Sequence, residues 1–178
     1  MIEVLPSNIR LDQLEKELSE FLGKHNFWDE RQVSLTSVTG ENDWFCSIGS
    51  MLDLPMPEKA YSVINKDLQG TYIAELIQEY KKFYRWRILN IPPGQFYSVH
   101  TDAFPEKINK RIHIPVLSND KAFFCYYEDK PADGVETKVQ FHYLQPGKVY
   151  EVNTSRLHSA INYGVEPRYH LVGVRYEK

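Results

Sequence analysis

The sequence predicts a mainly β protein, a two-sheet antiparallel β-roll with helices packed on its outside. Eight short segments rich in β-branched and aromatic residues follow Tyr84 at fairly even spacing, separated by turn residues, which is typical of a sandwich or barrel. Helical patterns, in contrast, fall within the first 83 residues. Aromatic residues make up 13% of the chain, and such rings favour half-buried pleated surfaces.

The N-terminal part predicts two amphipathic helices. Residues 8 to 25 carry apolar side chains at helical spacing, with charged residues largely on the other face and Gly23 as a stop signal. A second helix is predicted over residues 71 to 83 by the same spacing. Between them, residues 32 to 39 are β-like, and residues 40 to 60 predict an irregular loop.

The remaining chain predicts the β-roll. Its turns are marked by Pro92-Pro93-Gly94, Asp133-Gly134 and Pro146-Gly147. We expect one domain over residues 1–178, with a helical and irregular flanking part at 1–83 and the β-roll core at 84–178. The predicted strands are 86–91, 96–100, 111–117, 122–128, 138–144, 149–153, 157–162 and 169–176.

Composition and charge exclude several classes of protein. The formal net charge is -3 with a pI near 6.1, without the basic stripe that a nucleic-acid-binding protein needs. Neither a signal peptide nor an apolar run of membrane-spanning length is visible. The 2 cysteines, Cys46 and Cys125, favour buried thiols over a disulfide framework. We therefore expect a cytoplasmic protein without nucleic-acid or membrane partners.

Three residues predict a metal centre. His100 and Asp102 are two apart at the end of a predicted strand, so both side chains can reach one point. His158 lies on the seventh predicted strand, which two facing sheets can bring beside the second. Two histidines and one carboxylate on one face of an octahedron are the ligands of non-haem Fe(II) oxygenases, with three positions left open. A chance pair at a strand end and a core histidine bonded to a carbonyl are the alternatives.

Arg168 adds a candidate anion site. It follows His158 by ten residues, across a turn marked by Gly164 and Pro167, at the start of the last predicted strand. A guanidinium there could clamp a dianionic acid through two parallel hydrogen bonds. The alternative is an ordinary surface arginine.

Together these motifs resemble a known superfamily. Tyr97-Ser98-Val99-His100-Thr101-Asp102, Arg111-Ile112-His113-Ile114-Pro115, His158-Ser159-Ala160-Ile161-Asn162 and Arg168 are similar to those of the 2-oxoglutarate/Fe(II)-dependent dioxygenases. Within that superfamily the sequence is most similar to the aspartyl/asparaginyl β-hydroxylase group and the related bacterial free-proline hydroxylases. The resemblance covers roughly the last half of the chain. It implies a double-stranded β-helix, the cupin-like jelly roll.

The resemblance also implies roles for individual residues. His100, Asp102 and His158 would bind iron, and Arg168 would form a salt bridge to the distal carboxylate of 2-oxoglutarate. Arg111 and His113 match an Arg-x-His pair that lines the co-substrate pocket in the same group, and strand alternation puts both on one face.

The sequence departs from the family in two places. The founding β-hydroxylases have glycine where Asp102 stands, so the full triad is closer to the proline-hydroxylase branch. The proline hydroxylases extend further beyond the last strand, so their substrate specificity is not carried over.

The implied activity is hydroxylation of an amino acid, or of a residue in a peptide or protein. Fe(II) would be the metal, 2-oxoglutarate and O₂ the co-substrates, succinate and CO₂ the by-products, and ascorbate a supporting reductant. The partner would be a small-molecule or peptide substrate. Two alternatives remain: a cupin-like metal enzyme that does not use 2-oxoglutarate, and a non-catalytic β-roll binding module.

For several residues the sequence leaves two interpretations open. His170 and Tyr97 can line the pocket or pack in the core, and Asn162 can orient a ligand or hold a turn before Gly164. The segment 40–70 is a candidate substrate lid or partner surface.

Overall fold

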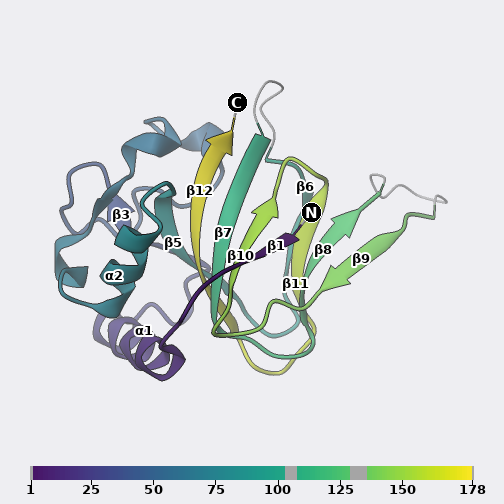
Figure 1. The fold of residues 1–178 in the computed structure, drawn as a ribbon, viewed down its shortest axis with the longest axis horizontal. Helices are drawn as coiled ribbons and strands as arrows, with labels where there is room; N and C mark the ends of the chain where they lie inside the picture. The colour runs from purple at the N-terminus through teal and green to yellow at the C-terminus, as the bar shows by residue number, and fades with distance from the viewer. Residues whose placement is uncertain (1, 103–107, 129–135, 178) are drawn as a thin grey trace.

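Two antiparallel sheets form the body of the protein (Figure 1). The computed structural model describes residues 2–102, 108–128 and 136–177. The six-stranded sheet has the order β1 (Ile2–Leu5), β10 (Val149–Asn153), β7 (Ile108–Leu117), β12 (Arg168–Glu177), β5 (Tyr84–Ile91) and β2 (Gln32–Ser34). The four-stranded sheet has the order β6 (Phe96–His100), β11 (His158–Asn162), β8 (Ala122–Tyr127) and β9 (Val139–His142).

The chain crosses repeatedly between these sheets. From β5 onward, β5, β7, β10 and β12 enter the larger sheet while β6, β8, β9 and β11 enter the smaller one. Two facing antiparallel sheets filled in this way form a double-stranded β-helix, or jelly roll. The fold class predicted from the sequence is therefore confirmed.

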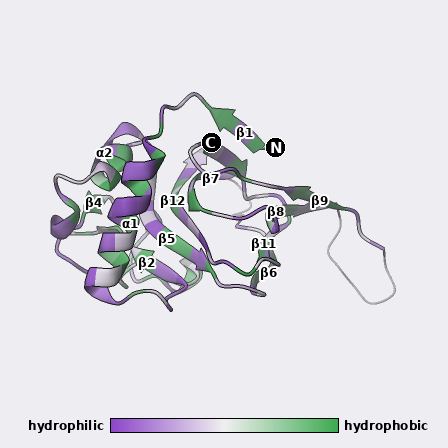
Figure 2. Ribbon diagram, turned by 90° about the horizontal axis from the view of Figure 1, so that it is seen from below, coloured by the Kyte–Doolittle hydropathy of each residue, from purple (hydrophilic) through white to green (hydrophobic). Residues whose placement is uncertain are grey.

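Two helices cover the outer face of the larger sheet (Figures 1 and 2). They are α1 (Leu11–His25) and α2 (Tyr72–Glu79), and their apolar sides enter the main hydrophobic core. Within the described residues, none of the helices is long and apolar enough to cross a membrane. The core combines helix and sheet residues, among them Leu14, Leu18, Leu22, Ile73, Leu76, Ile77, Trp86, Ile88, Ile112, Ile114, Val149 and Leu171.

Glu17 ties the two helices together. Its two carboxylate oxygens accept hydrogen bonds from the backbone N–H groups of Tyr72 and Ile73 at the start of α2. The Thr71 hydroxyl caps the same end by accepting from the Ala74 N–H. Together these acceptors satisfy backbone donors that the first turn of a helix cannot pair internally.

The linker before α2 contains short elements only. Strands β3 (Thr36–Ser37) and β4 (Val63–Ile64) pair with each other, and three 3₁₀ turns lie nearby. The turns are η1 (Met51–Asp53), η2 (Glu58–Ala60) and η3 (Lys66–Leu68). Glu58 anchors η2 to the sheet through a buried ion pair with Arg85 and a hydrogen bond from the Tyr176 hydroxyl.

The eight strands predicted from the sequence are all present, whereas several local details differ. The second helix ends at Glu79, because Tyr80 leaves the helical conformation and the chain turns into β5. The β-like stretch 32 to 39 is divided into β2 and β3 around Leu35, whose N–H bonds Trp86 O. Strands β1 and β4 were not predicted. The turn predicted at Asp133-Gly134 lies outside the described residues.

Strand alternation gives the larger sheet two different faces. Trp86, Ile88 and Ile112 point to the helices, whereas Arg87 and His113 point between the sheets. The inner face therefore carries polar and charged side chains, and the cavity described below lies there.

Candidate metal centre and substrate cavity

A cavity of about 540 Å³ lies between the two sheets. This volume is within the range typical of small-molecule sites. The larger sheet contributes charged and polar side chains to its wall, and the smaller sheet contributes histidines, serines and aromatic rings. Gly49, Ser50 and Leu52 of the linker complete the wall. The lining residues with ionisable side chains are Arg87, His100, Asp102, Arg111, His113, His158, Arg168 and Tyr97.

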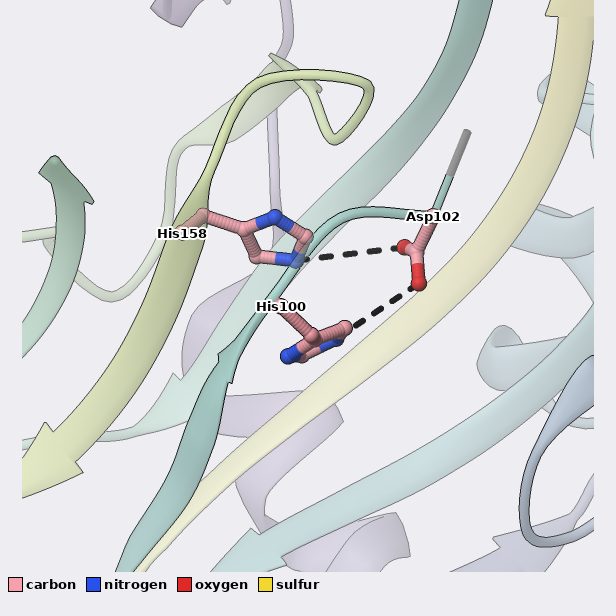
Figure 3. A group of neighbouring side chains, drawn as sticks. All are labelled: His100, Asp102 and His158. Carbon is pink, nitrogen blue, oxygen red and sulfur yellow. Dashed lines mark ion pairs between the residues drawn. The ribbon is translucent and has the colours of Figure 1, made fainter. Parts of the chain in front are cut away.

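His100, Asp102 and His158 come together at this cavity (Figure 3). Strands β6 and β11 pair so that His100 and His158 stand directly opposite each other, with ring centroids 4.4 Å apart. His100 Nε2 lies 3.5 Å from Asp102 Oδ1, and His158 Nε2 lies 3.9 Å from Asp102 Oδ2. One donor atom from each residue lies within 4.8 Å of the other two. The predicted convergence of the second and seventh strands is therefore present.

Backbone carbonyls orient both imidazoles. His100 Nδ1 lies 2.6 Å from Ser98 O, and His158 Nδ1 lies 2.8 Å from Arg156 O. Because a carbonyl oxygen can only accept, each Nδ1 must carry the proton and each Nε2 keeps a free lone pair in the neutral ring. Phe124 also stacks on the His158 ring at 5.4 Å. Both Nε2 atoms are thus prepared to bind a metal.

Asp102 is fixed through its backbone just beyond the end of β6. Its N–H donates to Thr154 O at 2.8 Å, and its carbonyl accepts from Asn109 Nδ2 at 3.3 Å. Thr154 and Asn109 in turn bond each other. This buried network holds the carboxylate opposite the histidines.

The carboxylate of Asp102 is held in its charged form. Burial alone would raise its pKa, but the positive charge of Arg111 lowers the pKa below the ordinary value. Arg111 Nη2 lies 2.6 Å from Asp102 Oδ2, although no N–H is aimed at that oxygen. Burial lowers the pKa of His158 to about 4, which keeps this imidazole neutral near pH 7.

The donor set fits a divalent transition metal. Two neutral imidazoles and one carboxylate are typical ligands of non-haem iron. Donors that each bond a metal at about 2.1 Å can lie at most about 4.2 Å apart, so only a small shift would close the site. The side chains of Asp102 and His158 are buried, whereas that of His100 is 41% exposed, which leaves one side open to solvent.

Arg168 lies on the wall of the same cavity, on the first residue of β12. It is 2% exposed, so it is not an ordinary surface arginine. Its Nη2 is buried without a hydrogen-bond partner, and burial lowers its pKa to about 10. A buried guanidinium without an anion is costly, and a carboxylate entering the cavity would remove that cost.

Arg111 and His113 both face the cavity from β7, as the alternation predicts, while Ile112 and Ile114 enter the core behind them. Arg111 also lies against Asp102, so it contacts the carboxylate of the candidate metal site as well as the cavity. His113 contacts His170 instead, with 3.4 Å between the two Nδ1 atoms.

The buried pair His113 and His170 predicts a loss of stability in mild acid. Burial first, and then the nearby Arg168, lowers both pKa values well below 6.5. The unfolded chain therefore takes up protons as the pH falls below about 6.5 while the folded rings do not, so stability falls with pH there. Urea unfolding of the metal-free protein at pH 7.5 and 5.5 measures this loss. His170→Gln should show a smaller loss than the native chain.

His142→Gln is the matched control, because that ring lies half-buried on β9 outside the cavity. From pH 7.5 to 5.5, the stability of His142→Gln should fall by most of the amount that the native chain loses. If His170→Gln lost as much stability as the native chain, the loss could not be assigned to the buried pair His113 and His170.

The structure also decides between the two interpretations of other residues. Asn162 holds a turn: its Nδ2 donates to Ile91 O and Glu166 O, and its Oδ1 accepts from Gly164 N. Tyr97 lines the cavity, and so do Gly49, Ser50 and Leu52 of the segment 40–70. His170 is fully buried behind His113.

Sequence reasoning missed three residues of the site. Arg87 lines the cavity from β5, Phe124 stacks on His158, and Thr154 holds Asp102. The alternation Arg85-Trp86-Arg87-Ile88 was a signal for Arg87, since it places an arginine on the face opposite the core. Phe124 and Thr154 carry no distinctive local pattern.

Comparisons with known proteins support the fold. No family model and no curated protein matches the chain. Among solved structures it is similar to AviO1 from Streptomyces viridochromogenes Tue57, with 10% identity, a TM-score of 0.54, and coverage of 99% of this chain and 89% of that one. It is also similar to SnoN, a non-heme alpha ketoglutarate dependent epimerase from nogalamycin biosynthesis, with 13% identity, a TM-score of 0.53, and 99% and 78% coverage.

A third similar structure is HygX from Streptomyces hygroscopicus with iron bound, with 11% identity, a TM-score of 0.52, and coverage of 98% of this chain and 81% of that one. At such identities the likeness concerns the fold. The chain therefore has the jelly-roll fold that non-haem, α-ketoglutarate-dependent enzymes also adopt.

Proposed function

We propose that the protein is a non-haem Fe(II), 2-oxoglutarate-dependent dioxygenase that hydroxylates an amino acid or a residue in a peptide or protein. The observation that carries the proposal is the convergence of three donor side chains in one cavity with a buried arginine, Arg168, whose Nη2 has no hydrogen-bond partner. A structural metal site would not require such an arginine. We further propose a single oxygenase domain over residues 1–178, located in the cytoplasm.

His100, Asp102 and His158 would hold the ferrous ion, and Arg168 would bind the distal carboxylate of 2-oxoglutarate. The bound metal would supply activation of O₂, coupled to conversion of 2-oxoglutarate to succinate and CO₂. The chain itself orients the two imidazoles through backbone carbonyls and keeps Asp102 ionised. Arg168 and His113 are buried, so a ligand bound against them would be shielded from solvent.

The subfamily assignment rests on fewer residues. The Arg111-x-His113 pair and the sequence after His158 favour the aspartyl/asparaginyl β-hydroxylase group, and Asp102 favours its proline-hydroxylase relatives. A cupin-like enzyme without 2-oxoglutarate is the second candidate, but it leaves the buried Arg168 without a ligand.

The direct test is turnover of labelled 2-oxoglutarate. With Fe(II), ascorbate and O₂, the protein should release labelled succinate even without its substrate, and 2-oxoglutarate should raise the melting temperature of the metal-loaded protein. Omission of the metal is the control. Absence of both succinate and the thermal shift would favour the binding-module alternative.

A further inference from the structure

We propose that the substrate carries a carboxylate of its own and that Arg87 binds this group. The inference rests on the proposed function, because it assigns Arg168 to 2-oxoglutarate and concerns the positive charge that then remains in the cavity.

Arg87 is buried at the cavity wall without an anionic partner. It lies on β5 and is 2% exposed. Its Nη1 donates to Gln32 Oε1 at 2.8 Å, whereas Nε and Nη2 are buried with no hydrogen-bond partner. Within the described residues no carboxylate forms an ion pair with it, and the nearby Glu58 is paired with Arg85. Two donors on one guanidinium thus remain available to grip a planar carboxylate.

The charges of the cavity favour an anionic substrate. Three guanidinium groups line it, those of Arg87, Arg111 and Arg168, against the single carboxylate of Asp102 among the described lining residues. A ferrous ion and a 2-oxoglutarate dianion would cancel each other and leave this excess unchanged. Burial first, and then the charges of Arg85 and Arg111, lower the pKa of Arg87 well below its ordinary value. A carboxylate on the substrate would neutralise part of the excess positive charge and offset the cost of burying the Arg87 guanidinium.

Arg87 and Arg168 lie in different parts of the cavity. On neighbouring strands Arg87 stands opposite Val172, and Arg168 stands opposite Ile91. These two positions on β5 are four residues apart, which corresponds to about 13 Å along the strand. Gln32 Oε1, which accepts from Arg87, also accepts from the Gly49 N–H, so Arg87 lies near Gly49 in the cavity wall. One end of the cavity would therefore hold the co-substrate, and the other the acid group of the substrate.

The test compares acetate with acetamide, its uncharged analogue, on protein loaded with Mn(II) and saturated with 2-oxoglutarate at constant ionic strength. Acetate should raise the melting temperature in a saturable manner, and acetamide should not. In Arg87→Gln the affinity for acetate should fall about tenfold or more, because a charge-assisted contact is lost. Arg31→Gln, at the surface near Tyr97, is the matched control and should respond as the native chain does.

Two results would overturn the proposal. One is an equal response of the native protein to acetate and acetamide. The other is loss of the 2-oxoglutarate shift in Arg87→Gln, which would assign this arginine to the co-substrate. If 2-oxoglutarate does not raise the melting temperature of the native protein, the proposed function fails. The comparison of acetate with acetamide in the absence of 2-oxoglutarate then still decides the role of Arg87.

A diffraction experiment covers the case in which the variant does not fold. Native crystals with Mn(II) and 2-oxoglutarate, soaked in sodium bromide, should show an anomalous peak at the Arg87 guanidinium. An absent peak, or a 2-oxoglutarate carboxylate on Arg87, would contradict the assignment.

Discussion

His158→Ala is expected to abolish succinate formation and to weaken Mn(II) binding by about 100-fold or more. Loss of a partner that merely orients a ligand already costs about 10- to 100-fold in metal affinity, and His158 would contribute a donor atom directly. Isothermal titration of the metal-free protein with Mn(II) measures the effect.

His142→Ala is the matched control, since this histidine lies on β9 and outside the cavity. It should bind Mn(II) as the native chain does. Circular dichroism shows whether either variant has lost the fold. A folded His158→Ala with native Mn(II) affinity would refute the proposed ligand set.

Arg168→Gln is expected to lower the affinity for 2-oxoglutarate by about 100-fold or more while Mn(II) uptake stays unchanged. Each charge-assisted hydrogen bond contributes about 1.5–3 kcal/mol, and a bidentate clamp loses two of them. The measurement is a 2-oxoglutarate titration of the Mn(II)-loaded protein.

The same substitution should not destabilise the ligand-free protein. The guanidinium is buried with Nη2 unpartnered, so its removal relieves a desolvation cost. Arg10→Gln, on the helical side where Arg10 pairs with Glu75, should leave 2-oxoglutarate binding intact. If Arg168→Gln lost metal uptake but still bound 2-oxoglutarate, the proposal that Arg168 binds the distal carboxylate of 2-oxoglutarate would be wrong.

The β-roll was predictable because its signals are local. Alternation of apolar residues and the prolines and glycines at the turns define each strand from β5 to β12 in the sequence itself. Strand β1 was not predictable in this way. Its four residues are partly or fully exposed, and they form a strand because they pair with β10, almost 150 residues later.

The site was predictable in part for a related reason. His100 and Asp102 are close in sequence, and His158 and Arg168 follow a recognisable spacing. Arg87 and Thr154, in contrast, are placed by backbone pairing between distant segments: β5, which carries Arg87, pairs with β12, and the Thr154 carbonyl accepts from the Asp102 N–H. Such pairings depend on the whole fold and leave little trace in a short motif.

The two histidines opposite Asp102 share one further property. Each ring is steered by the main-chain oxygen two positions earlier in its own segment, Ser98 for one and Arg156 for the other. Since these acceptors belong to the peptide backbone, no side-chain replacement at either position can delete them. The orientation of both rings therefore does not depend on the side chains of the surrounding cavity wall, so these side chains can change without loss of the candidate donor geometry.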